Sequence, residues 1–135
     1  MRETRRLSDQ YSEIGLRLIS EDEAFAKIRD SEVTVVFLAS DYPKRSRGKS
    51  ICGTCELVPD KWKWGCPADY AITVYEPNVQ EFTDKQMEIL ITHELMHVLV
   101  DYNKDGETVY RIAPHDLEDF RAIVARYGAD WSKVN

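Results

Sequence analysis

The stretch Thr92-His93-Glu94-Leu95-Met96-His97-Val98 contains the pattern His-Glu-x-x-His. An α-helix turns by roughly 100° per residue, so residues four apart lie one above the other on the same face. On a helix, His93 and His97 would therefore present two imidazoles to one ion, with Glu94 beside them. The spacing predicts a two-histidine zinc clamp with an adjacent base.

The chemistry of zinc explains this choice of residues. Zinc prefers nitrogen and sulfur ligands in a tetrahedral shell, and a catalytic site supplies three protein ligands and keeps one position for water. The bound cation lowers the pKa of that water, so a neighbouring carboxylate can take its proton. Glu94 fits the role of this base and not that of a ligand. The alternative is a structural polar group, because five-residue patterns of this kind also recur by chance.

Apolar residues surround the motif and predict that its helix is buried; they are Ile89, Leu90, Ile91, Leu95, Met96, Val98, Leu99 and Val100. The helix is expected to begin after the capping-box sequence Thr83-Asp84-Lys85-Gln86. It is expected to end near Asp101 or Tyr102, before the turn sequence Asn103-Lys104-Asp105-Gly106. Polar groups in such an apolar setting need a partner, because uncompensated burial is costly.

Upstream of the motif, three segments predict strands. Residues 33–39 are β-branched and aromatic and are apolar on both faces, which is typical of a central strand. Residues 50–58 and 70–76 predict two further strands. A capping box at Ser20 predicts a short helix over residues 20–30, and residues 1–19 are expected to form a mobile arm or a short helix.

Downstream of the motif, residues 108–112 predict a short strand and residues 116–127 a last helix. This helix has one apolar face and Gly128 as its cap; the face is formed by Leu117, Phe120, Ile123, Val124 and Tyr127. The whole pattern predicts an α+β fold in a single domain over residues 1–135. A short, mainly antiparallel sheet would pack with the metal-binding helix and the C-terminal helix.

Net charge and apolar patterning restrict the possible partners. The formal net charge of the 135 residues is -6, which disfavours binding to nucleic acid or to an anionic membrane. Two basic clusters, one at Arg2, Arg5 and Arg6 and one in a predicted loop over residues 41–49, are expected to be solvated surface. The sequence has neither an apolar run long enough to span a membrane nor the apolar core of a signal peptide, so we expect a cytoplasmic protein.

His115 is the histidine outside the motif, and it lies eighteen residues after His97. It stands at the start of the predicted last helix, which must pack on the core and would hold His115 near the metal. His115 is therefore the candidate third ligand. The alternatives are Asp116, Glu118 and Asp119, because catalytic zinc shells commonly contain three imidazoles or two imidazoles and a carboxylate. Asp116 and Asp119 are also candidates to orient a ligand imidazole.

Two further groups of residues leave alternatives open. An electrophile that stabilises the oxyanion is expected, and Tyr70, Tyr102 and Tyr110 are the candidates. Cys52 and Cys55 form a Cys-x-x-Cys pair, with Cys66 following. These cysteines could hold a second zinc, with Asp60 or Asp69 as a further ligand, or form a redox dithiol. The favoured interpretation is reduced, partly buried cysteines that behave as small hydrophobes.

Four blocks of the sequence resemble the putative phage metallopeptidase family, whose members are short zincin-like proteins encoded in bacteriophages and prophages. The blocks are Tyr70-Ala71-Ile72-Thr73-Val74, His93-Glu94-Leu95-Met96-His97, His115-Asp116-Leu117-Glu118-Asp119-Phe120 and Tyr127-Gly128-Ala129-Asp130-Trp131. The resemblance implies a zincin-like fold and a zinc-dependent hydrolase. It also implies that His93, His97 and His115 are the ligands and that Glu94 is the base. It implies nothing for the segment that carries the cysteines.

Three functions compete on this evidence. The leading one is a zinc metallopeptidase that acts on a protein or peptide substrate. A second is a protease of the SprT type, which acts on proteins near DNA, or of the ImmA type, which cleaves repressors; the basic clusters favour the SprT type and the net charge disfavours it. The third is a zinc-stabilised binding module that targets a host protein. Glu94 disfavours this module, because a structural site has no need of a base.

Overall fold

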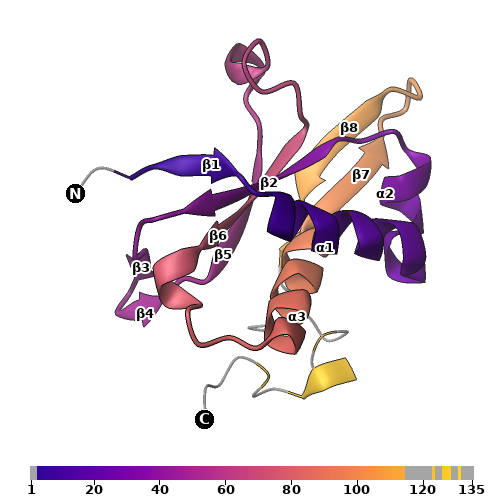
Figure 1. The fold of residues 1–135 in the computed structure, drawn as a ribbon. Helices are drawn as coiled ribbons and strands as arrows, with labels where there is room; N and C mark the ends of the chain where they lie inside the picture. Colours follow the sequence, from indigo (N-terminus) through magenta and orange to yellow (C-terminus); the bar gives the residue numbers. More distant parts are fainter. Residues whose placement is uncertain (1–2, 115–122, 124–125, 129–130, 132–135) are drawn as a thin grey trace.

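The computed structural model describes residues 3–114, 123, 126–128 and 131 (Figure 1). The fold is α+β, as predicted. In chain order, its helices and strands are β1 (Arg5–Leu7), α1 (Asp9–Glu21), α2 (Ala26–Asp30), β2 (Val35–Ser40), β3 (Arg45–Ser46), β4 (Lys49–Ser50), β5 (Gly53–Leu57), β6 (Tyr70–Tyr75), α3 (Asp84–Leu95), β7 (Val98–Tyr102) and β8 (Thr108–Ile112). Single 3-10 turns lie at Glu23–Phe25, Asp60–Trp62 and Glu76–Asn78.

The main sheet has four strands in the order β1-β2-β6-β5. The central strands β2 and β6 are parallel, with Val35 opposite Tyr70, and the outer strands β1 and β5 run antiparallel to their neighbours. Two antiparallel ribbons, β3–β4 and β7–β8, complete the described strands. The three strands predicted upstream of the motif are confirmed as β2, β5 and β6, and β2 is central as its two apolar faces indicated.

Helices α1 and α3 pack against each other, α1 on β2 and α3 on β5 (Figure 1). The core contains Phe37 and Ala39 from β2, Ile72 and Val74 from β6, and Leu18, Leu90, Ile91 and Leu95 from the two helices. Gly15 allows α1 to lie this close to the sheet. A Cβ at that position would be 2.1 Å from Cζ of Phe37, which is only 2% exposed. A side chain at Gly15 would therefore require the buried ring to move.

The N-terminal segment was expected to form a mobile arm or a short helix over residues 1–19. It contains β1, which pairs with β2 and places Arg5 opposite Ser40, and most of helix α1. The Arg5 guanidinium donates to the hydroxyls of Thr73 and Tyr75, each at 3.3 Å. Helix α1 then starts at the N-cap Ser8, not after Ser20. Local sequence did not indicate this, because β1 depends on a distant partner strand.

The motif helix also ends earlier than predicted. Its start is confirmed, since Thr83 and Gln86 form the expected reciprocal capping box. The expected end near Asp101 or Tyr102 is wrong: α3 stops at Leu95, and Val98–Tyr102 forms β7, which pairs with β8. The residues of β7 are mostly β-branched or aromatic, and a partner strand lets them pair as a ribbon. The predicted turn between β7 and β8 is confirmed, with Asn103 accepting from the backbone of Asp105 at 2.9 Å.

Two other predictions concern the surface and the C-terminal end. The loop expected over residues 41–49 contains the β3–β4 hairpin. The predicted last helix falls mostly outside the described residues, but Ile123 is fully buried and packs with Ile89 of α3. Arg126 donates to Asp22 at 2.8 and 3.2 Å, next to the end of α1. In the described parts of the chain, no helix is long and apolar enough to cross a membrane.

Candidate metal centre at the end of helix α3

The two histidines of the motif lie close together where α3 ends. His93 is in the last turn of the helix, and the chain continues in a tight turn in which the His97 amide donates to the Glu94 carbonyl at 3.1 Å. The two imidazole rings have centroids 5.3 Å apart at an interplanar angle of 66°. His97 thus follows the end of α3, yet the turn keeps its ring beside that of His93.

Ala113 holds His97 through both its backbone and its ring. The Ala113 amide donates to the His97 carbonyl at 2.7 Å, and the Ala113 carbonyl lies 2.7 Å from His97 Nδ1. A carbonyl can only accept, so Nδ1 carries the proton of this hydrogen bond. The lone pair of the neutral ring is then on Nε2, the nitrogen that would bind a metal. This orienting contact comes from the residue directly after β8, and the sequence motif did not indicate it.

Glu94 extends from α3 toward the edge strand β5. The residue is only 4% exposed, and its side chain passes over Gly53. A Cβ at position 53 would lie 3.3 Å from Glu94 Cγ and 3.4 Å from Oε2. The absence of a side chain at Gly53 therefore lets the Glu94 side chain pass close to the backbone of β5. Gly53 lies within the Cys-x-x-Cys pair, and no sequence motif indicated it as a site residue.

The cysteines behave as the favoured interpretation predicted. Cys52 and Cys55 are partly buried, reduced, and packed against the main core. Because side chains alternate along a strand, Cys55 shares the α3-facing side of β5 with Gly53. Burial raises the pKa of the Cys55 thiol, and the negative charge of Glu94 raises it further.

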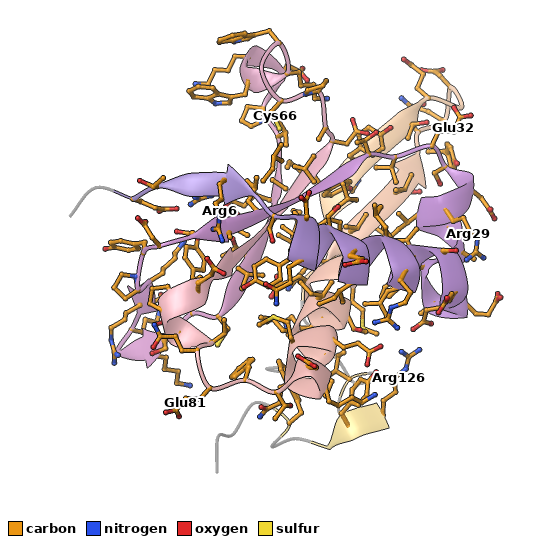
Figure 2. All side chains as sticks on the ribbon, in the orientation of Figure 1. Arg6, Arg29, Glu32, Cys66, Glu81 and Arg126 are labelled. Carbon is orange, nitrogen blue, oxygen red and sulfur yellow. The ribbon has the colours of Figure 1, made fainter. Side chains whose placement is uncertain are left out.

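Cys66 lies elsewhere, in the loop between β5 and β6 (Figure 2). Asp69 in the same region accepts from the backbone amide of Thr34 at 2.9 Å and pairs with Lys63. Within the described residues, no group of three or more His, Cys, Asp and Glu side chains is arranged to hold a metal ion. The described residues thus do not assemble the second zinc site considered for Cys52, Cys55, Cys66 and Asp60 or Asp69.

Trp131 is a second site neighbour that the motif did not reveal. Its ring centroid is 6.3 Å from that of His93, and its backbone carbonyl accepts from the Gln86 side chain of α3 at 3.2 Å. An indole against an imidazole restricts the ring and excludes water from one side of it. Trp131 occurs in one of the blocks that carry the family resemblance, but residue type alone did not assign it to the site.

The three candidate tyrosines occupy different places. The Tyr70 hydroxyl is 2.9 Å from the Leu99 carbonyl and 2.8 Å from that of Arg111, so it joins the main sheet to the β7–β8 ribbon. Burial raises the pKa of Tyr70 to about 12. The Tyr110 ring packs edge-on against Tyr70, and Tyr102 is 53% exposed at the turn end of the ribbon. The oxyanion-stabilising residue stays a prediction among the three.

His115 and its alternatives Asp116, Glu118 and Asp119 lie outside the described residues. The described part of the site supplies two imidazoles and one buried carboxylate. This donor set fits zinc, because imidazole is a common zinc ligand and a carboxylate that is not needed as a ligand can serve as a base. It does not by itself complete a three-ligand shell.

One comparison places the chain among known proteins. The model of the family described as putative phage metallopeptidase matches residues 6–135, which is nearly the whole chain. The match includes α3, β5 and the turn that carries His97, and a metallopeptidase family implies a metal cofactor. No curated protein and no solved structure matches the chain significantly. The chain therefore belongs to the putative phage metallopeptidase family.

Proposed function

We propose that this protein is a zinc-dependent metallopeptidase encoded by a phage or prophage, in which His93, His97 and His115 hold the metal and Glu94 is the general base. The observation that carries the proposal is the pair of imidazole rings 5.3 Å apart, next to a carboxylate that is 4% exposed. Two imidazoles that can hold a metal and a carboxylate beside them are the groups that a metal-activated water and its general base require. The family match supports the same class of reaction.

The described residues before His115 support its role as third ligand. Ala113 is hydrogen-bonded to His97 at both its amide and its carbonyl. Two residues of chain span at most about 7 Å, so the covalent connection to Ala113 limits how far His115 can be from this anchor. A third imidazole would complete the three-ligand shell of a catalytic zinc site.

Each residue has a separate task in the proposed reaction. When bound, zinc supplies Lewis acidity that polarises a peptide carbonyl and acidifies a water molecule. The Ala113 carbonyl fixes the His97 ring with Nε2 as the ligating atom. The Glu94 carboxylate accepts the proton of the attacking water and then delivers it to the departing amine, as a general base and acid. Burial of Glu94 keeps bulk water away from this proton transfer.

The proposal is tested with protein purified without chelators. We expect about one zinc ion per chain by elemental mass spectrometry, and zinc-dependent cleavage of a dye-quenched unfolded protein. Glu94→Gln keeps the shape of the side chain but cannot accept the proton, so it should retain zinc and lose about 100-fold or more in rate. Lys104→Glu, on the exposed β7–β8 turn, is the control and should cleave normally. Absence of zinc, or equal cleavage by Glu94→Gln, would overturn the proposal.

A further inference from the structure

The β3–β4 hairpin concentrates positive charge in a protein that is negative overall. Four of the 18 lysine and arginine residues, Lys44, Arg45, Arg47 and Lys49, lie within six positions, whereas the net charge of the chain is -6. Figure 1 shows the hairpin at the edge of the molecule, beside the start of β5. Arg45, Arg47 and Lys49 are exposed. The hairpin is thus a local cationic surface.

The hairpin is braced by hydrogen bonds at its base. The side-chain amide of Asn78 donates to the carbonyls of Lys44 and Ile51, both at 2.8 Å. The Ile51 amide donates to the Lys44 carbonyl at 3.0 Å, which closes the two arms. Asn78 belongs to the 3-10 turn after β6, so its two hydrogen bonds tie the base of the hairpin to the end of a main-sheet strand.

The tip of the hairpin is ordered as well. Arg47 and Gly48 have φ angles of 53° and 78°, as in the tight two-residue turns that match the twist of paired strands. The Arg45 guanidinium donates to the Gly48 carbonyl and to Ser50 Oγ. A charged surface that is already ordered loses little conformational entropy when it binds a partner.

The positive charges of the hairpin are not neutralised from within the described chain. None of its four cations forms an ion pair with a carboxylate among the residues that the structure describes. Lys44 is stabilised differently from the other three: it lies over the Tyr75 ring, 5.3 Å from its centroid, and donates to the Tyr75 hydroxyl at 3.4 Å, which leaves Arg45, Arg47 and Lys49 as the exposed charges of the hairpin. Like charges held this close repel one another, and an acidic partner would relieve that repulsion.

The hairpin leads directly into the candidate site. Only Ile51 and Cys52 separate β4 from Gly53, over which the Glu94 side chain lies. At about 3.3 Å per extended residue, Lys49 is at most roughly 13 Å and Arg47 at most roughly 20 Å away from Gly53. An extended peptide bound beside Glu94 would reach these cations about four to six residues from the bond that is cut.

We propose that the β3–β4 hairpin binds an acidic segment of the polypeptide substrate, about four to six residues to one side of the cleavage site. This inference rests on the proposed peptidase function and adds the substrate class to it. A polypeptide fits better than a nucleic acid, because the net charge of -6 opposes a polyanion that extends beyond the hairpin more than it opposes a short acidic segment.

The test measures binding separately from cleavage. Fluorescent peptides carrying a block of four glutamates on either side of an apolar centre are titrated into Glu94→Gln protein, alongside peptides with glutamine at the same positions. Of the two glutamate peptides, the one whose block lies on the side of the hairpin should bind at least about tenfold more tightly than its glutamine counterpart. High salt should reduce this difference. The double variant Arg47→Glu and Lys49→Glu, placed in the Glu94→Gln protein, should abolish the preference.

A matched double variant controls for net charge. Lys61→Glu and Lys104→Glu cause the same change in charge at two other exposed loops and should keep the preference for glutamate. Circular dichroism confirms that both double variants are folded. The inference is overturned if the variant with Arg47→Glu and Lys49→Glu keeps the preference for glutamate. It is also overturned if the control variant loses this preference to the same extent. Tighter, hairpin-dependent binding of a single-stranded oligonucleotide of equal length also overturns it, in favour of a nucleic-acid partner.

Cleavage assays keep the two proposals distinguishable. If the wild-type chain cuts glutamate and glutamine peptides equally well, the peptidase function stands and the hairpin inference fails. If the hairpin binds acidic peptides but no peptide is cut by the zinc-loaded wild-type chain, the docking surface stands and the peptidase function fails.

Discussion

The Glu94 side chain lies over Gly53, and a Cβ at position 53 would be 3.4 Å from Glu94 Oε2. It would also lie 3.2 Å from the Thr73 carbonyl, which belongs to the sheet and cannot easily move. The carboxylate is the more movable neighbour. The glycine of the edge strand and the acid of the helix therefore act together: the strand provides the space and the helix fills it.

Gly53→Ala should displace the Glu94 carboxylate and lower the rate of peptide cleavage. We expect kcat to fall by about tenfold or more while zinc content and KM change little, because the general base moves and the ligands do not. Steady-state kinetics and elemental mass spectrometry measure this. Gly65→Ala is the control, since a Cβ there meets no atom within 4 Å. Unchanged kcat in a folded Gly53→Ala protein would show that this space is not needed.

His115→Ala should remove the third zinc ligand. We expect zinc binding to weaken by about tenfold or more in a competition titration with a chromogenic chelator, because two imidazoles alone leave the metal under-coordinated. Asp116→Asn and Asp119→Asn are the matched controls and should change zinc affinity less. If one of these acids weakens zinc binding as strongly as the ligand variants His93→Ala and His97→Ala while His115→Ala does not, the third ligand is that carboxylate.

Gly15→Ala should destabilise the fold. The added methyl would lie 2.1 Å from Cζ of Phe37, a ring that is 2% exposed. Overpacking of this kind costs about 1–3 kcal/mol of unfolding free energy. Urea denaturation measures the loss, and Leu16→Ala on the exposed side of α1 should change stability by less than about 0.5 kcal/mol. Replacing the ring by a smaller side chain, in Phe37→Leu, should reduce the loss of unfolding free energy that Gly15→Ala causes. If Gly15→Ala costs the same in the Phe37→Leu background, the steric explanation is wrong.

The Asp22–Arg126 pair should make stability depend on pH in the acidic range. The hydrogen bonds from Arg126 lower the pKa of Asp22, and the bond from the Ala24 amide lowers it further, against the opposing effect of burial. A lowered folded-state pKa means that the stabilisation is present above the unfolded pKa of about 3.9 and is lost as pH falls through the folded value.

Asp22→Asn should therefore reduce stability at about pH 7 and converge with the wild type in strong acid. The pair is partly exposed, so the difference should not exceed about 1 kcal/mol. Urea denaturation across the acidic range measures it. Asp105→Asn, in the exposed β7–β8 turn, is the control. A difference that is constant down to strong acid would show that the carboxylate charge is not the cause.

Several features could be predicted from the sequence because they depend on residues close together in the chain. The Thr83–Gln86 capping box starts α3 where expected, and the apolar strands β2 and β6 lie at the centre of the sheet. The four-residue spacing of His93 and His97 brings the rings together, although α3 ends at Leu95 and a tight turn carries His97. Local hydrogen bonding and hydrophobic periodicity suffice for such features.

Other features were decided by tertiary contacts. The end of α3 at Leu95 depends on β8 as a partner for Val98–Tyr102, and the ordered N-terminal strand depends on β2, more than thirty residues away. The sequence by itself determined which residues are the candidates for the chemistry. Only the tertiary structure decided that Glu94 lies over Gly53 and that Ala113 orients His97. These relationships join segments that are distant in sequence, so no local pattern of residue types encodes them.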